Sequence, residues 1–151
     1  MTLPQGSEAQ VHPRVAALVD EFLIRSPVAR FLGIQLESLE VDRVVMRLPF
    51  RESNVVLGGV LHGGVIAALI DSAGAAASMS GAGESFNGGA TSGMSISYLE
   101  QVDRSALTAE AVTVRRGRSQ NVADVTVRLE NGKIAAKALV TCRLFRSEAT
   151  R

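Results

Sequence analysis

The chain has little of the residue types and charge patterns that mark several classes of protein. Its 151 residues contain a single cysteine, Cys142, which excludes an intrachain disulfide and with it a small disulfide-stapled secreted domain. Lysine and arginine total 16 against 15 acidic residues, so the formal net charge is +1. Without a strong overall charge or a block of one sign, we expect neither a nucleic acid nor an anionic membrane as a partner.

The sequence also lacks the segments that export or anchor a protein. Residues 1–10 are polar and carry neither the basic start nor the apolar core of a signal peptide, so we expect a cytoplasmic protein. The most apolar stretch, residues 55–79, contains His62 and Asp71 near its middle, and ionisable groups make a bilayer span costly. We therefore expect this stretch to lie buried inside the protein.

What the chain does have is enough apolar sequence for one sizeable core. Hydrophobic residues make up 46% of the chain and charged residues 21%, a balance typical of a folded domain. Near the N-terminus, Val15, Leu18, Val19 and Phe22 repeat with the spacing of an amphipathic helix that begins near Pro13. The other elements expected in this half are a short helix over 28–32 after Ser26-Pro27, strands over 34–39 and 43–50, and a helix over 65–79 that is apolar on nearly every side.

The second half alternates apolar and polar residues with a period of two, which predicts strands. The four expected strands cover the segments 94–98, 107–114, 123–129 and 134–145, and Asn131-Gly132 favours a tight hairpin between the last two. We predict an α+β fold in which one antiparallel sheet wraps one long helix and the last three strands form a meander. We divide the chain into an N-terminal helical segment (1–25), a main domain (26–146) and a C-terminal tail (147–151), with frayed ends.

Candidate chemistry begins at the start of the expected long helix, where His62 is followed by Gly63 and Gly64. Backbone N–H groups at a helix N-terminus have no helical partners and lie at the positive end of the helix dipole, so they can polarise a carbonyl or bind an anion. Glycine lets a ligand approach the backbone closely. A packed turn without any ligand would also use a pair of glycines.

Asp71 is the second candidate, because no other ionisable residue lies between His62 and Glu84. A carboxylate buried among apolar side chains is costly unless it is paired, solvated or functional, so Asp71 is either a base or nucleophile or a structural cap. Nine residues at about 100° each put His62 and Asp71 roughly half a turn out of phase. One straight helix cannot easily aim both at one substrate atom, whereas two chains related by a two-fold axis could.

In combination, these residues resemble a known family pattern. Leu61-His62-Gly63-Gly64 followed by Leu69-Ile70-Asp71 resembles the signature of hotdog-fold thioesterases of the PaaI (phenylacetate degradation) type. Ser26-Pro27 with Gly33, the strand Ser95-Ile96-Ser97-Tyr98-Leu99, and Arg116-Gly117-Arg118 in a hairpin turn support the resemblance. It covers residues 26–146 of the chain.

The resemblance implies a hotdog fold, a homodimer or homotetramer, and hydrolysis of acyl-CoA thioesters. It implies that the Gly63 amide stabilises the oxyanion and that an Asp71 from the partner subunit is the base or nucleophile. Thr91 matches the hydroxyl residue that often orients water in this family, and Ser92 lies beside it. Val56 stands where the family often has an asparagine, so Asn54, two residues earlier, becomes the candidate for a second substrate contact.

The remaining substrate contacts expected for such an enzyme are a second amide and a phosphate site. Gly64 would supply the amide, and Arg116, Gly117 and Arg118, which follow Arg115, would bind the nucleotide phosphates of coenzyme A. An ordinary solvated hairpin would also account for these arginines.

The histidine content argues against a metal centre. His62 has no companion except His12, which makes it a poor metal ligand, and we expect its ring nitrogens to fix the loop. We therefore predict no metal and no cofactor, since coenzyme A is part of the substrate. Cys142 has no histidine near it in sequence and is not expected to be a catalytic thiol.

Two other functions stay open at this point. One is a non-catalytic acyl-CoA-binding hotdog protein that senses its ligand, and the other is a hotdog hydratase or dehydratase that pairs His62 with Asp71. A purely structural protein would leave Asp71 unexplained. Aromatic residues make up only 4% of the chain, and both aryl and aliphatic acyl groups stay open, as does the choice between Asp71 as nucleophile and as base.

Overall fold

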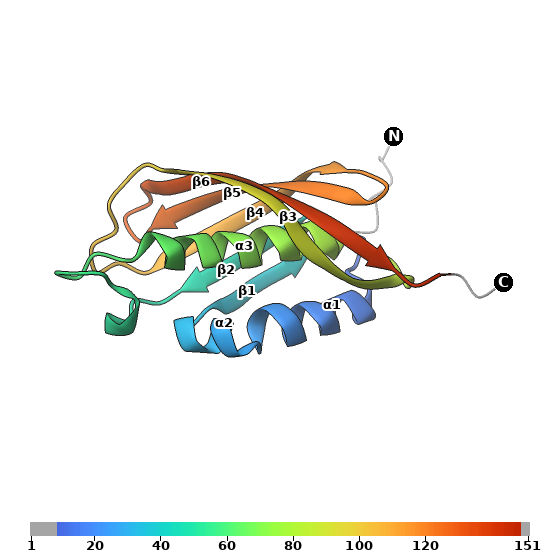
Figure 1. Cartoon of the computed structure of the whole chain (residues 1–151), viewed down its shortest axis with the longest axis horizontal. Helices are drawn as coiled ribbons and strands as arrows, with labels where there is room; N and C mark the ends of the chain where they lie inside the picture. The colour runs from blue at the N-terminus through green and yellow to red at the C-terminus, as the bar shows by residue number, and fades with distance from the viewer. Residues whose placement is uncertain (1–8, 149–151) are drawn as a thin grey trace, which may run out of the picture.

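The computed structural model of the chain describes residues 9–148 (Figure 1). Most of the ends that were expected to be frayed fall on residues 1–8 and 149–151, outside the described residues. In chain order the helical elements are α1 (Pro13–Val19), a π-helical turn (Asp20–Ile24), α2 (Pro27–Leu32), a 3-10 turn (Glu52–Asn54) and α3 (Gly63–Ser80). The strands are β1 (Gln35–Glu40), β2 (Arg43–Leu48), β3 (Phe86–Tyr98), β4 (Leu107–Arg116), β5 (Gln120–Leu129) and β6 (Ile134–Arg146).

The N-terminal helices follow the predicted start and stop signals. The Ser26 hydroxyl accepts a hydrogen bond from the N–H of Ala29, and Gly33 ends α2 with a φ of 86°. Val15 and Val19 are fully buried, as the helical stripe predicts, but Phe22 is 62% exposed and its expected place in the core is wrong. The reason is the wider π turn, in which the N–H of Arg25 donates to the carbonyl of Asp20, because this turn moves the i+7 position off the buried stripe.

The strands form one six-stranded antiparallel sheet in the order β1-β2-β4-β5-β6-β3, which confirms the predicted α+β class and the β4-β5-β6 meander. The Asn131-Gly132 hairpin is also confirmed, with a φ of 84° at Gly132. β3 begins at Phe86 and not near Met94. After Phe86 its first half consists of small or polar residues, which show no apolar alternation yet pair with β6. Both ends of the sheet order, β1 and β3, are therefore edge strands.

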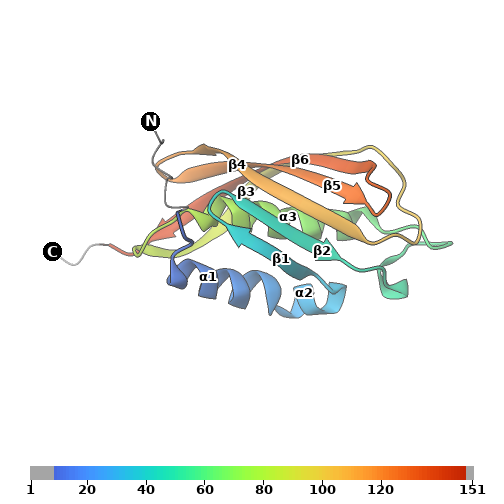
Figure 2. The same ribbon diagram turned by 180° about the vertical axis from the view of Figure 1, so that it is seen from behind.

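α3 lies along the inner face of the curved sheet, and α1 and α2 run beside β1 (Figures 1 and 2). The helix is long and apolar enough to cross a membrane by composition alone, but 67% of it is buried, as in the central helix of a folded domain. It packs so closely on β6 that a Cβ added at Gly74 would lie 2.7 Å from Val140. Val15 and Val19 of α1 belong to the same core, and the predicted boundary at residue 25 stays a prediction.

Cys142 is part of this core. It lies on the inner face of β6, is fully buried, and is paired in register with Thr91 of β3. Burial is the main cause that raises the pKa of the Cys142 thiol, to about 11, and the nearby negative charge of Asp71 adds to it, while a hydrogen bond with Thr91 acts in the opposite direction. The thiol is therefore protonated at neutral pH.

The raised pKa predicts that stability falls at alkaline pH. Between the ordinary pKa of 9.0 and the folded value of about 11, the unfolded chain has lost the thiol proton and the folded chain has kept it. The free energy of unfolding therefore decreases as the pH rises through this window. Urea denaturation across pH 8–11 should show a steeper loss for the wild type than for Cys142→Ser, whose hydroxyl does not titrate there; identical slopes would contradict the assignment.

Candidate active site

The N-terminus of α3 presents a single free amide, which belongs to Gly63. The His62 ring caps the helix, because its Nδ1 accepts a hydrogen bond of 2.8 Å from the N–H of Gly64. The N–H groups of Val65 and Ile66 donate to the carbonyl of His62 at 3.0 and 3.3 Å. Within residues 9–148, the N–H of Gly63 has no acceptor. The expectation that Gly64 supplies a second free amide is therefore corrected, whereas His62 does fix the loop as expected.

This capping arrangement depends on glycine at position 64. A Cβ added there would lie 2.8 Å from Nδ1 of His62, so any side chain would displace the ring. At Gly63 the nearest atom to an added Cβ is in the ring of Tyr98, at an ordinary contact distance of 3.7 Å. Because Nδ1 of His62 accepts a hydrogen bond, the neutral ring carries its proton on Nε2.

Asn54 lies behind the His62 loop and supports it. Its carbonyl accepts a hydrogen bond of 2.9 Å from the N–H of His62, and its Nδ2 donates to the carbonyl of Leu32 at 2.8 Å. Asn54 is 2% exposed, so its side chain is packed between α2 and the loop. The structure thus gives Asn54 a supporting place, and its role in substrate binding stays a prediction.

The second half of the site is a carboxylate in the middle of α3. Asp71 is half-buried, and its Oδ1 accepts a hydrogen bond of 2.5 Å from the hydroxyl of Thr91 on β3. The structure therefore brings together Asp71 and Thr91. Ser92 falls at a bulge between Thr91 and Gly93, and its hydroxyl donates to the carbonyl of Thr141 at 3.3 Å and accepts from Gln120 at 3.5 Å. Ser92 is thus hydrogen-bonded toward β5 and β6.

One helix holds both halves of the site at a fixed separation. Gly63 is the first residue of α3 and Asp71 lies eight residues later, so the two are about 12 Å apart along the axis at 1.5 Å per residue. A carbonyl group has to lie within hydrogen-bond distance of a donor and close to its attacking group at the same time. The Gly63 amide and the Asp71 carboxylate of one chain cannot both act on the same carbonyl.

Tyr98 is a site contact that the sequence did not single out. Its hydroxyl donates a hydrogen bond of 3.0 Å to the carbonyl of Gly63, and its ring packs on that glycine. In the sequence Tyr98 is notable only as part of the strand Ser95-Ile96-Ser97-Tyr98-Leu99. No local signal connects it with Gly63, because the two lie on different elements, 35 positions apart.

The arginine cluster lies at the other end of α3. Arg116 forms an ion pair of 2.7 Å with Asp42 and donates to the carbonyl of Gly81, so it ties the β1–β2 turn to the C-terminus of the helix. The N–H of Gly117 donates to the carbonyl of Gln120 and shapes the β4–β5 turn. Arg118 and Arg115 are exposed. With 18 residues in α3, this cluster is about 27 Å from Gly63 of the same chain.

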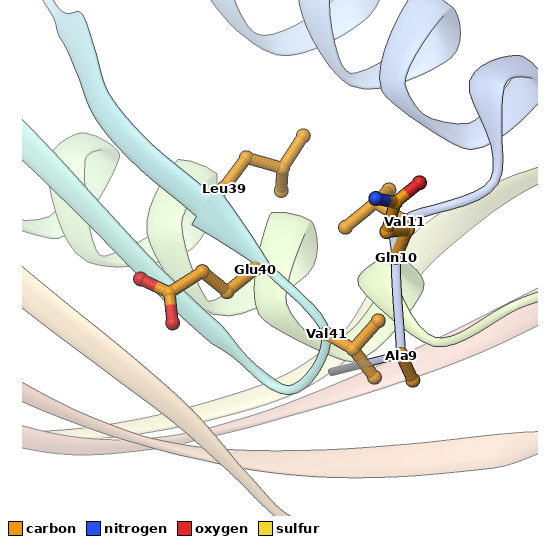
Figure 3. A pocket seen from close by; sticks show the side chains of 6 residues that line it. All are labelled: Ala9, Gln10, Val11, Leu39, Glu40 and Val41. Atoms are coloured by element: carbon orange, nitrogen blue, oxygen red, sulfur yellow. The ribbon is translucent and has the colours of Figure 1, made fainter. Parts of the chain in front are cut away.

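In the part of the chain that the structure describes, no three His, Cys, Asp or Glu side chains gather as they would around a metal ion. A cavity of about 630 Å³ lies elsewhere, between the residues before α1 and the β1–β2 turn (Figure 3). Its lining residues are Ala9, Gln10, Val11, Leu39, Glu40 and Val41, and it contains none of the predicted site residues.

Comparison with known proteins agrees with this arrangement. A family model described as the thioesterase superfamily matches residues 58–136, which include both halves of the site. A protein of Saccharolobus solfataricus named "Putative esterase" is 30% identical over 128 residues, covering 85% of this chain and 84% of its own length.

Two solved structures show the same fold. One is a "Hypothetical Thioesterase Protein with Coenzyme A" from Streptococcus pneumoniae, at 25% identity and a TM-score of 0.68 over 77% of this chain and 88% of the other. The other is the PaaI protein of E. coli, at 20% identity and a TM-score of 0.78 over 91% of this chain and 97% of the other, a likeness of fold alone. The predicted hotdog fold is confirmed, and the chain belongs to the thioesterase superfamily.

Proposed function

We propose that this protein hydrolyses acyl-CoA thioesters at sites formed between two chains. The observation that carries the proposal is the pairing, on one rigid helix, of a free Gly63 amide with a Thr91-bound Asp71 about 12 Å away. Each chain then contributes one half to each of two equivalent sites. The Gly63 amide of one chain meets the Asp71 carboxylate of its partner at the thioester carbonyl.

The Gly63 amide is suited to stabilise the charge that develops on the carbonyl oxygen. It lies at the positive end of the α3 dipole, and the contacts of His62 hold the backbone on either side of it. A donor that is already oriented before reaction is typically worth about 3 kcal/mol in the transition state.

Asp71 would activate water for the attack. The water oxygen bonds to the thioester carbon, its proton passes to the carboxylate, and the C–S bond breaks to release coenzyme A as a thiolate that then takes up a proton. Thr91 occupies Oδ1 of Asp71, which leaves Oδ2 as the oxygen that takes the proton. Direct attack by Asp71 would instead form a mixed anhydride and release coenzyme A as the thiolate; a single turnover in ¹⁸O-labelled water would then place label in Asp71 where water attacks the Asp71 carbonyl of that anhydride.

The edge strand β3 is the surface on which we place the second copy. β3 ends the sheet, and its 13 residues are mostly exposed. Met94 and Tyr98, which face the helix side, are 40% and 51% exposed. A long edge with free backbone groups and exposed apolar side chains is a surface that proteins cover. Pairing two copies there gives a homodimer, and two such dimers would make the homotetramer.

Coenzyme A recognition is proposed for the exposed arginines at the end of β4 and in the turn that follows it. The solved relative from Streptococcus pneumoniae contains coenzyme A, so that ligand fits this fold. Arg116 is already paired with Asp42, whereas Arg118 in the following turn is exposed and can meet a phosphate. Within a dimer, the arginines at the C-terminal end of one helix can serve a substrate bound at the other chain.

The hydratase alternative is disfavoured by the state of His62. A histidine that takes a proton from a substrate needs an unprotonated ring nitrogen, and in His62 the lone pair of Nδ1 is committed to the helix cap while Nε2 carries the proton. A non-catalytic acyl-CoA-binding protein would make the same contacts with its ligand and would lack only the chemical step. A turnover assay therefore separates the two functions.

The first test is release of free coenzyme A from aryl, short, medium and long acyl-CoA thioesters. Asp71→Asn and Asp71→Ala should lower kcat by roughly 10²–10⁴ because they remove the proton acceptor or nucleophile. Thr91→Val should lower it by roughly tenfold, as the loss of one hydrogen bond to a charged group predicts. Glu84→Gln, on an exposed carboxylate beyond α3, is the control. Binding of acyl-CoA without any hydrolysis would replace the enzyme with a ligand-binding protein.

The Gly63 amide can be removed without removing the helix start. Proline is favoured at the first position of a helix and has no N–H, so Gly63→Pro deletes the donor where the backbone tolerates the change. We expect kcat to fall by roughly 10²–10³. Gly63→Ala keeps the N–H, and its Cβ fits beside Tyr98, so it should retain most of the activity. Equal activity of both variants would exclude the amide as the donor.

Phosphate recognition by Arg118 is tested with a truncated substrate. Arg118→Ala should raise KM for an acyl-CoA by roughly tenfold, since it removes a charge-assisted contact. The same variant should leave KM unchanged for the corresponding N-acetylcysteamine thioester, which has no phosphates. Arg128→Ala, at the far end of β5, is the matched control. A rise in KM for both substrates would show that Arg118 acts on the protein and not on the phosphates.

A further inference from the structure

The contact between Tyr98 and Gly63 joins the edge strand to the proposed oxyanion amide. Tyr98 is the last residue of β3, pairs in register with Ala136 of β6, and faces the helix. Its hydroxyl donates to the carbonyl of Gly63 at 3.0 Å, and its ring lies over the first turn of α3. Although Tyr98 is 51% exposed, its backbone is held by pairing with β6 and its hydroxyl is held by the bond to Gly63.

The backbone at this point needs external restraint. Gly63 and Gly64 follow one another, and glycine populates more backbone conformations than any other residue. Several hydrogen bonds limit that freedom. The N–H of His62 donates to Asn54, the carbonyl of His62 accepts from Val65 and Ile66, the N–H of Gly64 donates to the His62 ring, and the carbonyl of Gly63 accepts from Tyr98. The Tyr98 bond is the one by which a side chain from another element holds the carbonyl of Gly63. The free N–H lies between these fixed points.

We propose that Tyr98 is a positioning residue of the oxyanion site, whose hydroxyl on the edge strand β3 fixes the orientation of the Gly63 backbone. The role rests on the proposed function, because it gives Tyr98 a task in stabilising the transition state. Tyr98 need not touch the reacting carbonyl, since it acts through Gly63. An amide that is held in place before reaction loses no free energy to reorientation when the charge develops.

The same strand also holds the other half of the site. Thr91 binds Asp71, and Tyr98 binds Gly63, and both side chains extend from the inner face of β3. One edge strand therefore fixes both catalytic groups of α3. Any partner that pairs with β3 also restrains the two groups that it holds.

The test compares Tyr98→Phe, which keeps the ring and removes only the hydroxyl, with the wild type. On whichever acyl-CoA thioester the wild type hydrolyses, we expect kcat to fall by roughly 5- to 20-fold, the effect of one lost hydrogen bond, with KM within about twofold. Ser97→Ala, on the neighbouring exposed residue of the outer face, should leave both constants unchanged. An unchanged kcat in Tyr98→Phe overturns the proposal.

A second measurement separates this inference from the proposed function. Hydrogen exchange of the Gly64 amide, followed by ¹⁵N NMR, reports the backbone restraint without any turnover, because this N–H is bonded to the His62 ring and shares a peptide unit with the Gly63 carbonyl. Tyr98→Phe should speed this exchange, by at least about fivefold, and leave the amides of β5 unchanged. If the wild type hydrolyses no thioester, the enzymatic proposal fails while the exchange result still decides whether Tyr98 restrains Gly63. Equal exchange in both proteins overturns the restraint.

Discussion

The burial of α3 inside the curve of the sheet is the constraint on which the rest of the molecule depends. This helix is apolar on nearly all sides, and fully buried residues such as Leu69, Ile70 and Ala73 have to be covered by the strands. Gly74 lets β6 approach so closely that no Cβ would fit. Because the helix is held along its length, the groups at its N-terminus and its midpoint keep one separation.

In the function that we propose, that fixed separation makes α3 one half of a catalytic arrangement. Within one chain the Gly63 amide and the Asp71 carboxylate are too far apart to serve one carbonyl, and the two-chain site that we propose rests on this separation, which is set by the rise of an α-helix. The exposed edge strand β3 is the surface on which we propose that the second chain binds. β3 binds both groups through Thr91 and Tyr98, and it also leaves an open edge for a second copy.

The parts of the structure that could be predicted from the sequence are those set by local pattern. Hydrophobic periodicity, the Ser26 cap and the Asn131-Gly132 turn are local signals, and the helices, the meander and the sheet class follow from them. Family resemblance suggests Thr91 only as a residue that orients water, and its hydrogen bond with Asp71, 20 positions away, has no local signal in the sequence. Asp71 itself could be identified as a candidate from the sequence, because a lone carboxylate in an apolar helix requires an explanation.

The remaining details depend on contacts between distant segments. Phe22 is exposed because of a π turn that its apolar spacing does not signal. The amide of Gly64 is occupied by its neighbour's ring, and Arg116 is paired with Asp42, 74 positions away. Tyr98 contacts Gly63 because β3 packs against the helix in the folded chain. Side-chain partners of this kind are decided by tertiary packing, which no local pattern records.

The two-chain site can be tested most directly by mixing its halves. Gly63→Pro and Asp71→Asn chains, each inactive alone, would be co-expressed with different tags and purified through both tags as mixed dimers. If each site takes Gly63 from one chain and Asp71 from the other, a mixed dimer contains one intact site and one doubly altered site. It should recover about half of the wild-type kcat per dimer, as one intact site out of two predicts. Activity no higher than that of either variant alone would contradict the account.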